Sequence, residues 1–254
     1  MTILDAIFLG ILQGVSEFLP ISSSGHLVVA QNLLGVAHAG ILFEVVVHLG
    51  TLLSILVVFR HDIAQLLGDL SSTRGRRYLA FLAYGTVPIA SAGLVFKSQV
   101  ESLFQNIQFV GGAFVATGVV LILSRFIVGR KSPVNGVRSL LIGLAQAVAL
   151  LPGISRSGVT IGTGLMMGLE PREAAKFSFF LAIPALIGSG ILMFGGFLSA
   201  TSQGESFAVL GAGIFTSFVA GLVSLKVLLR VLFRGNFHWF GAYCLVLGII
   251  TMGM

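Results

Sequence analysis

Charged side chains are scarce in this chain. Lys, Arg, Asp and Glu make up 9% of its 254 residues, whereas hydrophobic residues make up 56%. A soluble domain usually carries about 25% charged residues, so this composition cannot cover a water-exposed surface. We therefore expect lipid to be the main solvent of the protein. A spanning helix needs about 20 mostly apolar residues, so several crossings fit and little chain is left for soluble domains.

Other features are also lacking. Cys244 is the single cysteine and lies in an apolar run, which excludes an internal disulfide and a cysteine metal cluster. No basic stretch followed by a short apolar run and a cleavage site opens the chain, so we expect Met1 to begin the mature protein. The net charge of +6 could suggest nucleic acid, but the basic residues lie in short loops between apolar segments. Membrane topology already explains them there, and we expect no nucleic-acid partner.

Apolar runs predict an all-α polytopic membrane protein with six transmembrane helices. The predicted crossings are residues 40–59, 77–96, 107–127, 176–198, 207–229 and 238–254. Two further regions, 3–35 and 138–168, are apolar at their ends but are interrupted by Pro, Gly and Ser. We expect these regions to be re-entrant broken-helix segments that enter and leave the membrane by the same face.

The basic residues predict the orientation of the chain. If the crossings are right, 13 of the 15 Lys and Arg residues fall on one side. By the positive-inside rule that side is the cytoplasm. Of the other two, Lys97 lies on the opposite side and Arg156 lies inside the second broken region. The cytoplasmic set is Arg60, Arg74, Arg76, Arg77, Arg125, Arg130, Lys131, Arg138, Arg172, Lys176, Lys226, Arg230 and Arg234.

The two broken regions resemble each other. QGVSEFLPISSSG at 13–25 aligns without a gap on QAVALLPGISRSG at 146–158, and both contain I-S-x-S-G. Three predicted crossings separate the copies, and an odd number makes the second copy enter from the opposite face. The sequence therefore predicts one integral membrane domain made of inverted repeats, approximately 1–127 and 134–254, whose broken helices meet near the midplane around a polar cavity.

Polar side chains gather in these broken regions. Gln13 and Glu17 are four residues apart, so they share one face of a helix. The first copy also supplies Ser22, Ser23, Ser24 and His26, and the second supplies Ser155, Arg156, Ser157 and Thr160. A buried carboxylate or guanidinium is costly in a membrane and marks a functional site. Each serine or threonine could instead bond a neighbouring carbonyl group.

A further pair lies in the first predicted crossing, where Glu44 and His48 are four residues apart. Glu44 is a candidate metal ligand for the same reason as Glu17. His48 could simply be an interior histidine that is hydrogen-bonded to Glu44.

This set of groups suits a phosphorylated ligand. Arg156 offers a planar fork for phosphate oxygens, and a helix start beside glycines and serines favours an anion. Gln13, Glu17 and Glu44 offer oxygens to a hard divalent cation, Mg²⁺ or Ca²⁺. A hydroxyl group beside a carboxylate and a histidine can act as an activated nucleophile. The residues therefore predict a membrane-embedded, metal-assisted phosphoryl-transfer site.

The two long motifs, QGVSEFLPISSSGH at 13–26 and PGISRSGVT at 152–160, resemble the signatures of the undecaprenyl-diphosphatase family of the bacitracin-resistance type. FEVVVHLG at 43–50 and FSFFLAIPA at 177–185 are also similar to family segments. The resemblance implies a multi-pass enzyme of the bacterial plasma membrane, with a site open to the extracytoplasmic side. It would convert undecaprenyl diphosphate to undecaprenyl phosphate and recycle this lipid carrier for peptidoglycan synthesis. A homodimer is also implied.

The resemblance assigns roles residue by residue. Glu17, Ser23, His26 and Arg156 would be catalytic, with Ser23 as the candidate nucleophile, His26 as its acid/base partner and direct attack by water left open. Gln13 stands where the family has Glu or Gln, so Glu17 is the main candidate for metal binding or for the base. The residues that would bind the substrate phosphates are Ser22, Ser155, Arg156, Ser157 and Thr160.

A transporter or lipid flippase is the alternative function, because broken midplane helices in inverted repeats also build transporters. Such a protein would bind the same phosphate headgroup without releasing phosphate. A purely structural membrane protein would leave Glu17 and Arg156 unexplained.

Overall fold

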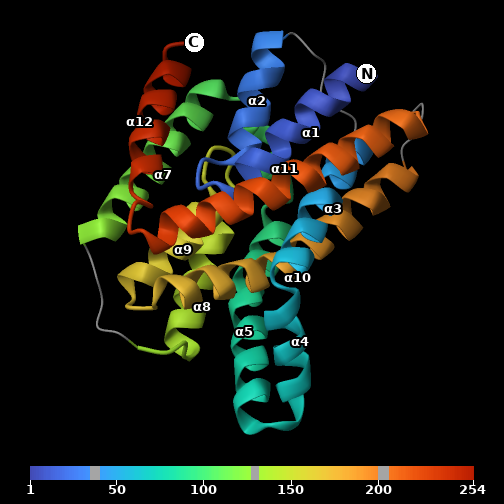
Figure 1. Cartoon of the computed structure of the whole chain (residues 1–254). Coiled ribbons are helices and arrows are strands. Elements are labelled where there is room, and N and C mark those ends of the chain that lie inside the picture. Colours follow the sequence, from blue (N-terminus) through green and yellow to red (C-terminus); the bar gives the residue numbers. More distant parts are fainter. Residues whose placement is uncertain (35–40, 127–131, 200–205) are drawn as a thin grey trace.

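The computed structural model describes residues 1–34, 41–126, 132–199 and 206–254, and the fold of these residues is helical throughout (Figure 1). Arg130 and Lys131, two of the basic loop residues, lie outside them. The helices are α1 (Ile3–Phe18), α2 (Ser23–Leu34), α3 (Ile41–Val58), α4 (Arg60–Gly68), the 3-10 helix η1 (Asp69–Ser71), α5 (Thr73–Val95), α6 (Lys97–Leu103), α7 (Ile107–Phe126), α8 (Gly136–Val148), α9 (Arg156–Met166), α10 (Pro171–Ser199), α11 (Phe207–Phe233) and α12 (Trp239–Met252).

Four of these helices are long and apolar enough to cross a membrane by themselves, namely α5, α7, α10 and α11. The first predicted crossing corresponds to α3, which qualifies together with α4 and η1 although the pair is bent by 68°. The sixth corresponds to α12, which is apolar but has only 14 residues. The described chain is therefore an all-α polytopic membrane protein, and the count of six crossings stays a prediction.

Both regions that were predicted to be broken helices are broken. Leu19, which precedes Pro20, has an extended backbone with ψ 142° because a residue before proline avoids the helical region. Ser22 then adopts φ 67°, and Gly153 in the second turn adopts φ 94°. These left-handed positions reverse the chain between α1 and α2 and between α8 and α9.

The two turns lie side by side in the middle of the molecule, where Figure 1 draws them in blue and yellow. The Ser157 hydroxyl group donates to the backbone carbonyl of Leu19 at 3.4 Å. Thr117 of α7 fixes the second turn, because its hydroxyl donates to the Gly153 carbonyl at 3.0 Å and accepts from the Ser155 N–H at 3.1 Å. The irregular backbone is thus satisfied by protein groups, as a membrane interior requires.

Close helix contacts position the broken helices. A Cβ added to Gly143 of α8 would lie 2.2 Å from the Gly85 carbonyl oxygen of α5, and one added to Gly14 of α1 would lie 2.5 Å from the Ser217 carbonyl oxygen of α11. Neither space admits a side chain, so α8 lies directly on α5 and α1 lies directly on α11. Small residues are the usual means of such close packing within membranes.

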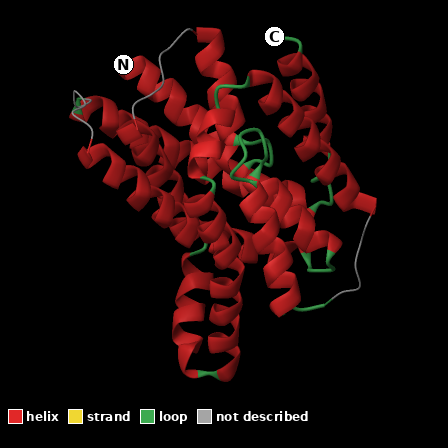
Figure 2. Cartoon of the chain, turned by 180° about the vertical axis from the view of Figure 1, so that it is seen from behind, coloured by secondary structure: helices red, strands yellow, loops and turns green. Residues whose placement is uncertain are grey.

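A hairpin of α4 and the first turns of α5 projects from the helical body (Figure 2). It carries the exposed residues Arg60, Arg74, Arg76 and Arg77. Both chain termini lie at the opposite end of the molecule. The basic residues of this hairpin are therefore separated from the termini by the full depth of the helical body.

Candidate active site

Glu17 is the centre of the polar groups that the broken segments supply. It lies in the last turn of α1 and is 8% exposed. Its Oε2 atom accepts hydrogen bonds from Gln13 Nε2 at 3.1 Å and from the Ser23 hydroxyl at 2.7 Å. The predicted common face of Gln13 and Glu17 is therefore confirmed. The Ser23 hydroxyl comes from the first residue of α2, so the first broken segment folds back onto its own carboxylate.

Arg156 reaches Glu17 from the other half of the chain. Its Nη2 atom forms an ion pair with Glu17 Oε1. The Arg156 side chain is 14% exposed and that of Glu17 is 7% exposed, so both charges are largely withdrawn from the surroundings. Arg156 Nη1 is buried and has no hydrogen-bond partner among the described residues. One arm of the guanidinium fork is thus engaged by the protein, and the other has no protein partner among the described residues.

The two turns have the same local construction. Ser22 accepts a hydrogen bond from the Gly25 N–H at 3.3 Å, and Ser155, the N-cap of α9, accepts one from the Gly158 N–H at 3.1 Å. In each copy the hydroxyl of this serine also lies 3.3 Å from that of the serine two residues later. Serine is a favoured N-cap because its side chain accepts from a free backbone N–H of the first turn. The variable position of I-S-x-S-G is then the one that reaches Glu17, as Ser23 in one copy and Arg156 in the other.

Thr160, which was predicted to bind a substrate phosphate, has two protein partners in this structure. Its hydroxyl group donates to the Arg156 carbonyl at 2.7 Å and lies 2.6 Å from the Ser178 hydroxyl of α10. A hydroxyl group has a single proton to donate, and in Thr160 the protein uses it. Thr160 therefore links the Arg156 carbonyl to α10 in this structure, and its role in phosphate binding stays a prediction.

The predicted pairing of Ser23 with His26 is not made in this structure. His26 Nδ1 lies 2.7 Å from the Ser22 carbonyl oxygen, and Nε2 lies 2.7 Å from the hydroxyl of Tyr243 on α12. The ring also stacks on Tyr243 at a centroid distance of 5.8 Å. Both ring nitrogens thus have other partners. Because Ser23 donates to Glu17, the carboxylate is the group placed to take its proton.

His48 is hydrogen-bonded to Glu44, as one interpretation of the sequence expected. The His48 ring bonds the backbone carbonyl of Glu44 through Nδ1 at 2.7 Å. In the part of the chain that the structure describes, no three His, Cys, Asp or Glu side chains gather in a metal-binding group. The role of Glu44 as a metal ligand stays a prediction.

The residues around Glu17 fit a divalent cation that the substrate helps to bind. Mg²⁺ is usually held by one or two carboxylates together with substrate phosphates. Glu17 is such a carboxylate, and Gln13 Oε1 beside it is buried without a partner among the described residues. Gln13 Oε1 and an oxygen of Glu17, which also bonds Arg156, Gln13 and Ser23, would be the ligands that the protein offers to a cation.

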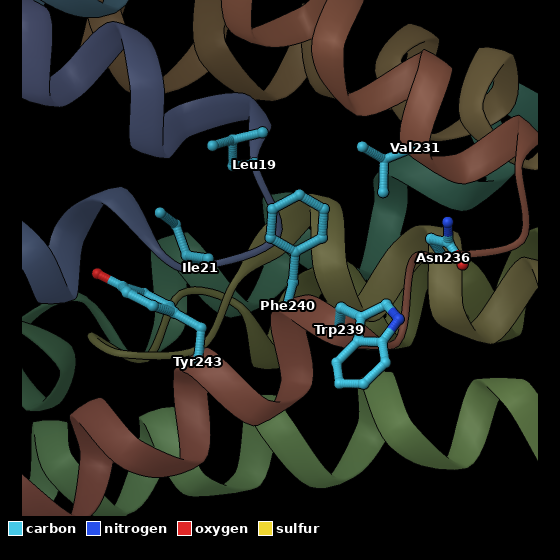
Figure 3. A pocket seen from close by; sticks show the side chains of 7 residues that line it. All are labelled: Leu19, Ile21, Val231, Asn236, Trp239, Phe240 and Tyr243. Atoms are coloured by element: carbon cyan, nitrogen blue, oxygen red, sulfur yellow. The ribbon is translucent and has the colours of Figure 1, made fainter.

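A pocket of about 520 Å³ adjoins the first turn (Figure 3). Its walls are Leu19 and Ile21 from the turn, Val231 from α11, Asn236, and Trp239, Phe240 and Tyr243 at the start of α12. Leu19 also borders a second apolar groove, of about 480 Å³, between α1 and α11. Two lining residues are hydrogen-bonded to the polar site, because Tyr243 bonds His26 and the Leu19 carbonyl accepts from Ser157.

Comparison with known proteins gives a consistent result. The family model described as bacitracin resistance protein BacA matches residues 6–250. The chain belongs to this family. Proteins named undecaprenyl-diphosphatase are similar over almost their full length. The one from Desulfosudis oleivorans is 39% identical, covering 98% of this chain and 97% of the relative. The one from Korarchaeum cryptofilum is 38% identical, covering 100% of both chains.

Three residues that support the site in this member of the BacA family were not anticipated from the sequence. Thr117 and Ser178 each lie in a long apolar helix, where a hydroxyl group usually bonds a carbonyl of its own helix, so the sequence gives no sign of their partners. Tyr243 lies in an apolar run near the C-terminus, which gives no sign that it meets His26. All three contacts join different helices or turns, at sequence separations from 18 to 217 residues.

Proposed function

We propose that this protein hydrolyses undecaprenyl diphosphate to undecaprenyl phosphate and inorganic phosphate. The observation that carries the proposal is the meeting of Glu17, Ser23 and Arg156 where the two broken helices converge. A cation for phosphate, a carboxylate and a hydroxyl group are the parts that a phosphoryl-transfer site needs. The names of the relatives supply the substrate, since proteins 38–39% identical to this one are undecaprenyl-diphosphatases.

Arg156 binds the diphosphate and stabilises the charge that develops on it. Nη1 is free to donate to a phosphate oxygen while Nη2 stays with Glu17. The positive end of α9, whose first residue is Arg156, points at the same anion. Donors that are fixed before the reaction need no rearrangement when the negative charge grows.

Ser23 and Glu17 form the nucleophilic pair of the proposal. Glu17 Oε2 takes the proton of the attacking oxygen, which then bonds the terminal phosphorus while the bridging P–O bond breaks and undecaprenyl phosphate leaves. If the attacking oxygen is that of Ser23, water later hydrolyses the phosphoserine and releases phosphate. If it is water, Ser23 orients the water. A divalent cation held by Gln13 Oε1 and Glu17 would neutralise charge on the phosphate oxygens.

The apolar pocket beside the turn would receive the first prenyl units. Its walls are mostly hydrophobic and aromatic, and two of its lining residues also bond the polar site, Leu19 to Ser157 and Tyr243 to His26. A prenyl chain that leaves here passes sideways into lipid, where burial of each CH₂ group contributes about 0.8 kcal/mol.

The finer architecture belongs to the same proposal, namely six crossings with the two halves as inverted repeats. The packing supports it, because α1 lies on α11 and α8 lies on α5, which are equivalent pairs if each half contributes a broken segment and three crossings. The separation of the basic hairpin from the termini supports a cytoplasmic hairpin and a site that opens to the extracytoplasmic side of a bacterial plasma membrane. The homodimer implied by the family resemblance is part of this proposal as well.

Phosphate release by the purified protein tests the function. Detergent-solubilised protein is incubated with undecaprenyl diphosphate, with and without chelator, and inorganic phosphate is measured over time. The proposal predicts one phosphate released for each diphosphate consumed, and a loss of release in chelator. A protein that transports lipid without hydrolysis gives no phosphate under any condition.

A further inference from the structure

Buried polar atoms without partners are concentrated in the two broken segments. The described residues contain five such side-chain atoms, and four of them belong to Gln13, Gln146 and Arg156. Gln146 is the extreme case, because both its Nε2 and Oε1 are unpartnered while the residue is 0% exposed. Buried polar groups in folded proteins are nearly always hydrogen-bonded, so a residue with two unmet atoms requires an explanation.

Gln146 occupies the position in the second half that Gln13 occupies in the first. Both lie in the gap-free alignment of the two motifs, and each follows by three residues a glycine packed on a neighbouring helix, Gly10 on α11 and Gly143 on α5. Gln146 belongs to the last turn of α8, just before the turn that carries Arg156. Gln146 and Arg156 therefore belong to the same broken segment, at the end of its first helix and the start of its second.

The contacts of the first half indicate what the second half lacks. Gln13 and Ser23 donate to the same oxygen, Oε2 of Glu17. Their equivalents in the second half are Gln146 and Arg156, but Leu150 stands where Glu17 would be. Leucine cannot accept a hydrogen bond, so the second half has two donors and no anion of its own.

We infer that Gln146 is a substrate-binding residue whose amide N–H donates to the same diphosphate that Arg156 Nη1 binds. The substrate anion would be the acceptor for Gln146 that the Glu17 carboxylate is for Gln13. The inference rests on the proposed function for the identity of the diphosphate. It explains why the amide is unmet in the protein without ligand, since its partner arrives with the substrate.

Gln146→Leu tests the inference with two measurements. The variant has leucine at position 146, as the natural chain has at position 150, and leucine has neither of the two unpartnered polar atoms. The melting temperature of the ligand-free protein should therefore rise, by about 2–4 °C for each kcal/mol gained in the free energy of unfolding of a chain of this size. KM for undecaprenyl diphosphate should rise about tenfold or more, with kcat changed less than about threefold; tenfold corresponds to about 1.4 kcal/mol. Gln99→Leu, at an exposed position of α6, is the matched control and should change neither quantity.

A second measurement, of thermal stability with a bound ligand, does not depend on hydrolysis. Inorganic pyrophosphate has the diphosphate without the prenyl chain, and it should raise the melting temperature of the wild type more than that of Gln146→Leu. If wild-type protein releases no phosphate but this difference persists, the proposed function fails and the inference stands. A KM within twofold of wild type, a lower melting temperature for ligand-free Gln146→Leu, or equal stabilisation of both proteins by pyrophosphate would each show that Gln146 has an ordinary structural partner.

Discussion

Replacement of Arg156 by lysine tests whether the site requires the planar guanidinium group or only a positive charge. The guanidinium group would have two partners, because Nη2 binds Glu17 and Nη1, which has no partner among the described residues, would bind the diphosphate. A lysine ammonium group is compact and cannot hold both partners in the same plane. It satisfies either the buried carboxylate or the phosphate. We therefore expect Arg156→Lys to fold and to lose most of its turnover.

The size of the loss follows from the role of the free arm. Removal of one donor that stabilises transition-state charge typically lowers kcat by about 10²–10³, equivalent to about 2.7–4 kcal/mol. Alanine is a poorer test, because it leaves Glu17 as an unpaired carboxylate with its side chain 7% exposed. Loss of one partner of a buried ion pair typically destabilises a protein by about 3–5 kcal/mol. Arg156→Ala would thus mix misfolding with the catalytic defect.

The assay is phosphate release by purified variants that are matched for folded protein by their size-exclusion profiles. Arg125→Lys is the control, since Arg125 is exposed at the end of α7 and lies near His238 rather than Glu17. The control should keep wild-type turnover, whereas Arg156→Lys should lose about a hundredfold or more. Retention of more than half of the wild-type rate by Arg156→Lys would refute the fork and leave Arg156 as a generic charge or a structural partner of Glu17.

Further predictions concern metal, topology and the prenyl pocket. Glu17→Gln should abolish phosphate release, as should chelator with the wild type, and full activity in excess chelator would rule out metal assistance. Reporter fusions after Arg77 should indicate the cytoplasm and those near Ser98 the outside; the reverse at both positions would contradict the inverted repeat. Val231→Trp should fill the pocket beside the first turn and raise KM for undecaprenyl diphosphate more than for a short-chain prenyl diphosphate, whereas Val223→Trp, in the neighbouring groove, should not. Equal effects of the two tryptophans would remove the pocket from the proposal.

Much of the site could be predicted from the sequence because its signals are local. Pro20 and Pro152 interrupt apolar runs, and the I-S-x-S-G motif repeats. These features predict two broken helices without knowledge of their neighbours. The spacing of Gln13 and Glu17 places them on one helical face, and the hydrogen bond between them is present. Glu17 and Arg156 stand out in apolar surroundings because a buried charge is costly.

Roles that depend on which long-range partner a side chain meets could not be predicted in this way. The family resemblance implied that His26 pairs with Ser23, yet the His26 ring bonds Tyr243, 217 positions away. Thr160 belongs to the phosphate-binding motif, yet Ser178 and the Arg156 carbonyl engage its hydroxyl. A hydroxyl or imidazole group has several partners of similar strength, and packing selects among them.

The sequence by itself determined that the protein is helical, lies in a membrane, and has a polar motif in each half. These properties follow from composition, periodicity and proline, which act over a few residues. Only the tertiary structure decided that Ser23 and Arg156 meet on a single carboxylate, and that Gln146 is left without one. The turns carrying these residues are more than 130 positions apart, and their meeting depends on how α1 packs on α11, how α8 packs on α5, and how Thr117 fixes the second turn. No local pattern encodes the distance between two such turns.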